Sequence, residues 1–466
     1  MKSAAQGTRK APPNPLGIGD GRVLVYGLGR SGLAAAQLLT RHRIPFGFYD
    51  DTEVPGYRQL SDKIRWPEVQ VHFQSLPQEV LMGYDLVVVS PGVPAQSPTL
   101  LMLKGAGLNV ISEIELAFAF TPAPVIAVTG SNGKTTTVTM AELLLNTAGF
   151  KAKATGNIGY PFSLAVLDEK PDYFVVECSS FQLHHIERFA PRAAIITSFA
   201  PNHLDWHGDE ESYFQSKMNV VNNLGAKQPV IIPAGNARIA GALKKSKAKK
   251  LTFGTRGDVA FDEKHGTITR KVKGKKVIYA ELKPILAHLT YDFRIISEAA
   301  MAVSALASAL GLKGRVVEQM IAAFTPLHHR IEVVGKKDGV TYINDSKSTS
   351  VDATIFALKK QSNPVVLMLG GRDKGLSFHE LIPAALGRVK AVVVFGEARE
   401  KIAREIGGEL PLESAVNLDE AVARARRLAN PGEVVLFSPA CASYDQFKNY
   451  EERGEAFRKI VNSLKA

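Results

Sequence analysis

Short apolar runs alternate along this chain with longer segments in which apolar residues recur at helical spacing. This alternation is typical of parallel sheets covered by helices, so the pattern predicts an α/β fold. The runs fall into three blocks, at 22–26, 46–49 and 84–89, then at 125–129, 173–176 and 193–197, and finally at 340–344, 364–369, 391–395 and 434–437. An alanine-rich helical stretch near 298–310 ends the second block.

The three blocks predict three domains, because a chain of 466 residues is too long for one hydrophobic core. We place their bounds at 1–112, 113–326 and 327–466. The first and third domains are expected to be Rossmann-like. The central domain is expected to resemble a P-loop ATPase built on a parallel sheet.

The run Val125–Thr129 leads into a glycine-flanked loop that ends in Lys-Thr-Thr. Backbone N–H groups in such a loop, and the N-terminus of the following helix, point at phosphate oxygens. Lys134 would add positive charge, and the Thr135 hydroxyl would complete a Mg²⁺ shell. Val128 stands where the usual pattern has glycine, which leaves a shorter GxxGKTT form. The loop predicts an ATP site made by Gly130, Ser131, Asn132, Gly133, Lys134, Thr135 and Thr136.

A second glycine-rich loop, GLGRSG at 27–32, follows the first apolar run and is expected to open a helix. Asp50 and Asp51 end the next run, where dinucleotide folds carry a ribose-binding acid. The pattern favours a pyrophosphate at the helix N-terminus and suits NAD, FAD and a UDP-sugar equally; a structural turn is the alternative. Two such loops in one chain indicate two phosphate-bearing ligands, an odd requirement for a dehydrogenase.

Composition places the chain among ordinary globular proteins, with 45% hydrophobic and 22% charged residues. No apolar run approaches the roughly 20 residues of a membrane span, and the polar N-terminus lacks a signal-peptide core. The chain has two cysteines, Cys178 and Cys441, which are far apart in the sequence. We therefore expect no disulfide framework, a reducing cytoplasm, and a packed side chain at each position. Much of the net charge of +12 comes from the basic runs 244–250 and 270–276, neither of which contains an aromatic residue. We therefore expect a solvated face that attracts anionic small molecules, with no nucleic-acid partner.

Ligands for Mg²⁺ should lie at strand ends near the phosphate loop. Glu177 ends the run 173–176 and is the candidate metal ligand, because an acid ending a buried run is otherwise costly. His203 lies in a loop after the next run. It could ligate a metal or orient phosphate, and a capping loop is the alternative.

A series of longer motifs follows in order along the chain: GSNGKTT at 130–136, GNIG at 156–159, ECSSFQL at 177–183, NHLDWHG at 202–208, YFQSK at 213–217, HHRIE at 328–332, NDSKST at 344–349, GGRDKG at 370–375 and SPACASYDQFKNYEERG at 438–454. This series resembles the Mur ligases, three-domain ATP-dependent enzymes that form amide bonds in peptidoglycan assembly. The resemblance is thin between about 225 and 325. NDSKST and the last motif are most similar to the branch that adds D-glutamate to UDP-N-acetylmuramoyl-L-alanine.

The resemblance implies roles for individual residues. The implied contacts to the UDP substrate are Arg30, Ser31, Asp50, Gly92 and Asn157. Arg330 and Asp345 would contact ATP from the third domain. The implied metal ligands are Thr135, Glu177, His203 and Lys217, the last after carbamylation into an anionic oxygen ligand. Without the resemblance, Lys217 is an ordinary exposed lysine on a helix.

Thr349, Lys374, Ser443 and Tyr450 match the residues that hold D-glutamate in similar enzymes. A lysine charge and hydroxyl donors suit two carboxylates. Lys134, His203 and Lys217 would be catalytic in a ligase that acts through an acyl phosphate, with ATP and Mg²⁺ as cofactors. The resemblance also implies a cytoplasmic monomer that serves cell-wall synthesis, cell shape and cell division.

Some residues depart from the family pattern. The segment 292–300 lacks the His-Asn pair that contacts adenine in similar enzymes, and Tyr450 replaces the usual phenylalanine. Asn202 stands where the wider family often has aspartate. Of the alternatives, a diaminopimelate- or lysine-adding Mur ligase would carry an Asp-Asn-Pro-Arg motif that is absent here. Folylpolyglutamate synthase has no UDP-type first domain, and an NAD-dependent oxidoreductase would leave Lys134 without a role.

Overall fold

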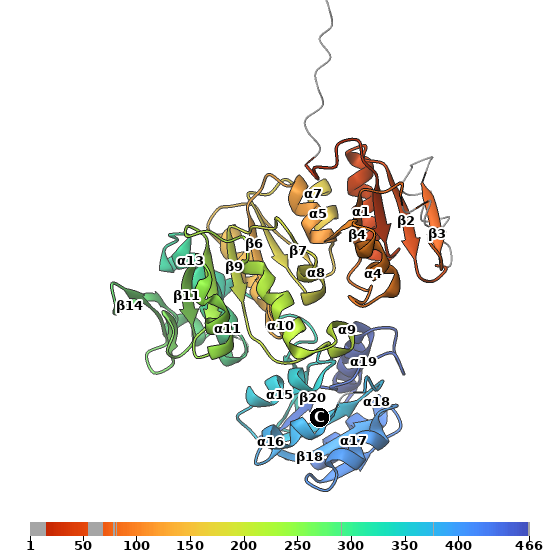
Figure 1. Ribbon diagram of the computed structural model, residues 1–466. Helices are drawn as coiled ribbons and strands as arrows, with labels where there is room; N and C mark the ends of the chain where they lie inside the picture. The colour runs from red at the N-terminus through yellow and green to blue at the C-terminus, as the bar shows by residue number, and fades with distance from the viewer. Residues whose placement is uncertain are drawn as a thin grey trace, which may run out of the picture. The chain divides into compact units, whose positions relative to one another are not determined.

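Figure 1 shows a computed structural model of the chain, which describes residues 15–54, 69–77, 80, 82–289, 291–375 and 377–464. In this described part the strands form three mainly parallel sheets, which confirms the predicted α/β class and its three domains. Contacts divide the chain into two compact units. Unit 1 extends to Ala287 and includes Glu298–Ala323, and unit 2 comprises His288–Ser297 and the chain from Phe324 onward. Unit 1 holds two of the sheets, and the bounds proposed at 112 and 326 stay predictions.

The first sheet of unit 1 is parallel and has the order β3-β2-β1-β4-β5. Val23 and Val25 pack with α1 on one face, while Leu24 packs with α4 on the other. Both faces are covered, which explains why the runs are apolar at every position. The elements are β1 (Val23–Tyr26), α1 (Arg30–Arg41), β2 (Phe46–Asp50), β3 (Gln70–Phe73), β4 (Leu86–Val89), α4 (Pro98–Gly105), β5 (Asn109–Ser112) and α5 (Glu113–Phe120).

The second sheet of unit 1 has the order β14-β13-β12-β11-β10-β9-β6-β8-β7 and is parallel from β7 to β12. Its strands are β6 (Val125–Thr129), β7 (Ala152–Gly156), β8 (Tyr173–Glu177), β9 (Ala193–Ile196), β10 (Pro229–Pro233), β11 (Lys249–Phe253), β12 (Val259–Asp262), β13 (Thr267–Val272) and β14 (Lys275–Glu281). The antiparallel β13–β14 hairpin exposes residues 271–278, so this basic segment is solvated as expected.

The helices of this part of unit 1 include the one that follows the phosphate loop. They are α6 (Lys134–Thr147), α7 (Phe162–Asp168), α8 (Ser180–His184), α9 (Leu204–His207), α10 (Glu210–Met218), α11 (Ala237–Ala242), α12 (Lys283–Leu286), α13 (Ser297–Ala309) and α14 (Gly314–Ala323). Among the described residues, none of the helices combines the length and apolarity that a membrane crossing requires.

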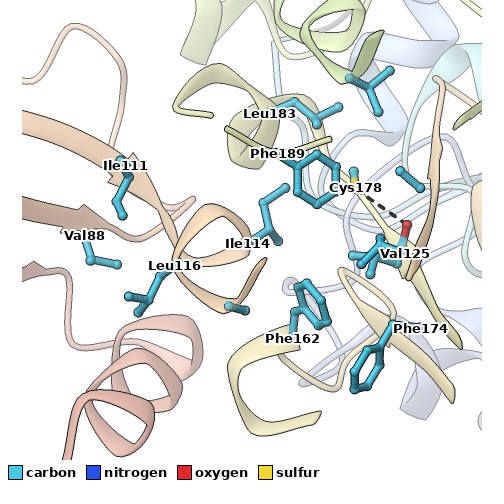
Figure 2. Close-up of a cluster of buried hydrophobic side chains, with 14 of the residues drawn as sticks. Val88, Ile111, Ile114, Leu116, Val125, Phe162, Phe174, Cys178, Leu183 and Phe189 are labelled. Carbon is cyan, nitrogen blue, oxygen red and sulfur yellow. Dashed lines mark hydrogen bonds between the residues drawn. The ribbon is translucent and has the colours of Figure 1, made fainter. Parts of the chain in front are cut away.

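One continuous core joins the two sheets of unit 1 through α5. Figure 2 shows Ile114 and Leu116 of this helix between Val88 of the first sheet and Phe162 of α7. Cys178 lies in the same cluster with no exposed surface and is unpaired, as expected for a packed cysteine. The loop after β1 and the phosphate loop after β6 are therefore carried by one packed body.

Two buried acids of α5 accept hydrogen bonds from the backbone of neighbouring segments at this junction. Glu115 accepts hydrogen bonds from the backbone N–H groups of residues 187–189, at 2.7 to 3.1 Å. Glu113 Oε1 accepts from the Ser163 N–H at 2.5 Å, whereas Oε2 has no partner among the described residues. Burial raises the pKa of Glu113 to about 6, because the charged form loses more solvation than this one bond returns.

Unit 2 contains the third sheet, of order β15-β16-β20-β17-β18-β19, in which only the edge pair β15–β16 is antiparallel among the described pairings. Helices α15, α16 and α17 pack on one face, and α18 and α19 on the other. The strands are β15 (Glu332–Lys337), β16 (Val340–Asn344), β17 (Val365–Gly370), β18 (Val389–Phe395), β19 (Leu412–Ser414) and β20 (Val434–Phe437). The helices are α15 (Val351–Lys359), α16 (Ile382–Ala385), α17 (Arg399–Ile406), α18 (Leu418–Leu428) and α19 (Tyr450–Ser463).

The raised pKa of Glu113 predicts a pH-dependent stability. A carboxyl that holds its proton more tightly when folded stabilises the fold below its unfolded pKa of 4.5, and this contribution is lost as pH rises through about 6. Relative to Glu113→Gln, the wild type should therefore lose about 2 kcal/mol of unfolding free energy between pH 4.5 and 7. Denaturant unfolding at both pH values measures this loss.

Glu263→Gln is the matched control, because Glu263 is exposed in the turn between β12 and β13. It should show no such difference from wild type. An unfolding free energy difference between wild type and Glu113→Gln that stays constant over this pH range would contradict the assignment.

Candidate active site

The phosphate loop joins β6 to α6, as predicted, and its glycines are required by the backbone. Gly130 has a φ of +144°, and a Cβ there would lie 2.0 Å from Thr197 Oγ1. Gly133 has a φ of +80° and is the N-cap of α6. Both conformations are strained for residues with a side chain. The glycines therefore let the loop turn closely against Thr197, which directly follows β9.

Part of this loop is bound to the neighbouring loop after β9. The Ser131 N–H donates to Ser198 O at 3.1 Å, and the Asn132 N–H donates to Ser198 Oγ at 2.9 Å. The Ser131 hydroxyl donates to Ala200 O at 2.7 Å. These donors hold the loop in shape. The first turn of α6, from Lys134 to Thr136, has N–H groups without acceptors inside the helix, and it is the part best suited to an anion.

Two lysines converge on the backbone of this loop. Lys134 Nζ donates to Gly130 O and to Ser131 O, each at 2.9 Å, and Lys217 Nζ donates to the same Gly130 O at 3.0 Å. Lys217 is only 3% exposed, so the expectation of an ordinary surface lysine is wrong. Burial, reinforced by the charge of Lys134, holds the pKa of Lys217 well below its usual range.

Glu177, a predicted metal ligand, ends β8. It is hydrogen-bonded to Asn157, a predicted contact of the UDP substrate. Asn157 Nδ2 donates to Glu177 Oε1 at 2.9 Å, and the Asn157 N–H donates to Glu177 O at 2.9 Å. Glu177 Oε2 is buried and has no hydrogen-bond partner among the described residues. A buried carboxylate oxygen of this kind fits a ligand of Mg²⁺, which prefers hard oxygen donors.

His203 precedes α9 and is exposed, with a φ of +56°. Its own N–H is donated to Asn202 Oδ1 at 2.8 Å, and its ring lies 4.9 Å from that of Phe181. An exposed imidazole is accessible to a metal or a phosphate. A left-handed backbone is uncommon for residues other than glycine, and such strain occurs most often at functional sites.

A largely buried hydrogen-bonded group of two histidines and two serines was not predicted from the sequence. His207 Nε2 lies 2.9 Å from Ser180 Oγ, and Ser216 Oγ lies 2.8 Å from His184 Nδ1 and 3.4 Å from His207 Nδ1. The members come from α8, α9 and α10. Their spacing in the sequence gives no signal, because only the packing of these helices brings them together.

Four of the five predicted UDP contacts lie at the carboxyl ends of strands in the first sheet, whereas Asn157 follows β7 of the second sheet. Arg30 and Ser31 begin α1 after β1, Gly92 follows β4, and Asp50 ends β2. The order of strands reverses at β1, which is where open α/β sheets bind ligands. Asp50 Oδ2 accepts from the Leu28 N–H at 2.8 Å, and the Arg30 guanidinium donates to Gly159 O. The carboxylate thus supports the glycine loop itself.

In unit 2, Asp345 is buried at the end of β16. Its carboxylate accepts from Ser348 Oγ at 2.5 Å, Ser438 Oγ at 2.7 Å and the Ile331 N–H at 3.2 Å. Burial raises its pKa to about 6, and these donors oppose that rise. Arg330 is next to Ile331 and has a buried Nε with no hydrogen-bond partner among the described residues. This Nε is a donor suited to an anion.

The predicted D-glutamate residues lie on loops after adjacent parallel strands. Thr349 follows β16, Ser443 follows β20 and Lys374 follows β17. Lys374 Nζ is exposed and donates to Thr349 O at 3.4 Å. Ser443 is only 2% exposed. Tyr450 begins α19, with Lys347 Nζ 5.3 Å from the centre of its ring.

Models of three domain families match the chain. The Mur ligase MurD-like N-terminal domain matches residues 21–112, the Mur ligase middle domain 128–299, and the Mur ligase glutamate ligase domain 329–441. Among solved structures, MurF of Thermotoga maritima in complex with ADP is similar to this chain with a TM-score of 0.59 and 17% sequence identity. The match covers 96% of this chain and 97% of the MurF chain. This likeness concerns the fold.

Curated relatives match along nearly the whole chain. The UDP-N-acetylmuramoylalanine–D-glutamate ligase of Salinibacter ruber is 37% identical over 95% of this chain and 98% of its own length. The enzyme of the same name from Koribacter versatilis is 37% identical over 95% of this chain and 97% of its own length. Identity of this extent, with family models in the same order, exceeds what a shared fold alone produces. This chain belongs to the Mur ligase family.

Proposed function

We propose that this chain is an ATP-dependent ligase that joins D-glutamate to the alanyl carboxylate of UDP-N-acetylmuramoyl-L-alanine in peptidoglycan precursor synthesis. The observation that carries the proposal is the 37% identity to D-glutamate ligases over 95% of the chain. The phosphate loop with Lys134 and the acid Glu177 at the next strand end supply the chemistry that such a reaction needs.

A carboxylate is a poor electrophile, so the reaction activates it first. One oxygen of the alanyl carboxylate attacks the γ-phosphorus of ATP, ADP leaves, and an acyl phosphate forms. The amine of D-glutamate then attacks the acyl carbon. The C–O bond to phosphate breaks, inorganic phosphate leaves, and the amine loses a proton as the amide forms. The products are ADP, phosphate and the lengthened peptide.

Lys134 and the first turn of α6 would hold the transferring phosphoryl group. Lys134 Nζ donates hydrogen bonds to Gly130 O and Ser131 O, so the ammonium group lies at the loop that would bind phosphate. Thr135, Glu177 and His203 would hold Mg²⁺, which when bound neutralises charge that develops on the phosphate oxygens. His203 would also donate to the oxyanion formed when the amine attacks.

Lys374, Thr349 and Ser443 would hold the two carboxylates of D-glutamate, and Tyr450 would line that pocket. Arg330 and Asp345 would contact ATP. The proposed UDP contacts are Arg30, Ser31, Asp50, Gly92 and Asn157. Because the proposal divides the substrates between both units, turnover requires the whole chain. We also propose that it works as a monomer in the cytoplasm; the free, buried cysteines support the reducing compartment.

Carbamylation of Lys217 is part of the proposal. Its Nζ is buried beside the cation Lys134, and both donate to one carbonyl oxygen. A neutral Lys217 amine that attacks CO₂ forms an N–C bond and releases one proton, which turns a would-be second cation into an anion. The carbamate would serve as a fourth metal ligand, and the lowered pKa of Lys217 favours the neutral amine this step requires.

The substrate assignment predicts when phosphate is released. The purified chain should release phosphate from ATP only when UDP-N-acetylmuramoyl-L-alanine and D-glutamate are both present, because the acyl phosphate turns over only when both are bound. A panel of amino acids with a phosphate-release readout measures this. Release with another amino acid but not with D-glutamate would rule out the assignment.

Lys134→Ala should lower kcat by about 10²–10³-fold or more, because it removes a preorganised charge from the phosphoryl group. Steady-state phosphate release checks this value. Lys244→Ala is the control, since Lys244 is an exposed lysine of the same domain and should retain wild-type kcat. Unchanged turnover in Lys134→Ala would refute the phosphate role.

The carbamate predicts a new carbon resonance. Wild-type protein equilibrated with ¹³CO₂ should show one carbamate signal by ¹³C NMR that is missing in Lys217→Arg. Lys170→Arg, an exposed lysine, should keep the signal. A wild-type spectrum without this signal at saturating ¹³CO₂ would count against the modified lysine.

A further inference from the structure

Arg453 of α19 is the largest fully buried side chain in the described part of unit 2, with 0% of its surface exposed. Burying a guanidinium is costly unless hydrogen bonds replace its hydration. Removal from water lowers its pKa to about 10, which still leaves it charged near neutral pH. A charged group kept at this depth requires acceptors that compensate for the lost water.

The acceptors are neutral oxygens on two loops. Arg453 Nε donates to Ser346 Oγ at 3.0 Å, and Nη2 donates to Ser346 O at 2.8 Å. Nη1 donates to the carbonyl oxygens of Cys441 and Ala442, each at 3.1 Å. Ser346 follows β16, and the two carbonyls follow β20, the neighbouring strand. The guanidinium therefore joins the NDSKST loop to the SPACAS loop.

The GGRDKG loop after β17 packs at the same place. The Arg372 N–H donates to Ala442 O at 2.8 Å. A Cβ at Gly371 would lie 2.2 Å from Ala442 O and 2.9 Å from Arg453 Nη1, and its φ of +135° also favours glycine. One carbonyl, that of Ala442, thus receives donors from Arg453 and from the third loop. Three loops from adjacent strands meet around one side chain.

We infer that Arg453 is a positioning residue that sets the spacing of the groups that bind the amino-acid substrate. Ser443 directly follows Ala442, and Lys374 and Thr349 lie two and three residues after Arg372 and Ser346. The planar guanidinium, with donors in a fixed fork, can hold these loops at one separation. Arg453 has no exposed surface, so it acts through its neighbours. The inference rests on the proposed function, which assigns D-glutamate to these loops.

The same contacts indicate which substrate should be affected most. Asp345, the proposed ATP contact, has its own donors in Ser348, Ser438 and the Ile331 backbone. None of these three hydrogen bonds is donated by Arg453, although Asp345 directly precedes Ser346, which Arg453 does hold. The backbone beside Ser443, in contrast, is held by the guanidinium directly. Loss of the fork should therefore loosen the amino-acid pocket more than the ATP contact.

The test is Arg453→Lys, which keeps the charge and most of the length but removes the fork. The KM for D-glutamate should rise about tenfold or more, because Lys cannot bond both loops at once, while the KM for ATP changes less than about threefold. Arg424→Lys is the control, since Arg424 forms a surface ion pair with Glu420 on α18, and it should keep both KM values.

Folded Arg453→Lys with a wild-type KM for D-glutamate, or with equal rises for D-glutamate and ATP, would overturn the inference. If circular dichroism shows that this variant does not fold, Ser346→Ala removes the Nε acceptor instead and is judged by the same two KM values. Failure of the proposed function is distinguishable, because the wild type itself would then release no phosphate with D-glutamate.

Discussion

The carbonyl oxygen of Gly130 accepts hydrogen bonds from two lysines, and the proposed ATP site is built around this arrangement. Two like charges at such a separation in a buried place repel strongly unless one of them is lost or reversed. A phosphate group on the loop would balance the charge of Lys134, and a carbamate on Lys217 would reverse the second charge. The proposed phosphate and carbamate would each relieve the repulsion between Lys134 and Lys217.

The parallel sheets decide where the other groups lie. In each sheet the loops at the carboxyl ends of adjacent strands meet at one edge, so residues distant in sequence come close together. Asn157 and Glu177 meet after the adjacent strands β7 and β8, and Lys374 and Thr349 meet after β17 and β16, which flank β20. This geometry suits a ligase, because several substrates must be held by short polar loops on rigid elements.

Much of the fold could be predicted from sequence, because runs such as Val125–Thr129 and Val434–Phe437 are apolar at every position and became buried parallel strands. The phosphate loop was also predictable, since Gly130 and Gly133 are required by local backbone conformation. β3 and β5 were missed, as their sequences are short and partly polar. The burial of Lys217 could not be foreseen, because it depends on how α10 packs on the phosphate loop. The role of Ser198 as an acceptor for that loop depends instead on the sheet, because Ser198 follows β9, the strand that pairs with β6.

The central claim is that ATP activates the alanyl carboxylate as an acyl phosphate, and an isotope experiment tests it directly. UDP-N-acetylmuramoyl-L-alanine labelled with ¹⁸O at both carboxylate oxygens is converted in the presence of D-glutamate and ATP, and the products are analysed by mass spectrometry. Transfer of one ¹⁸O to inorganic phosphate, with the other retained in the amide, is the result that this account predicts. Unlabelled phosphate, or ¹⁸O in AMP, would contradict it.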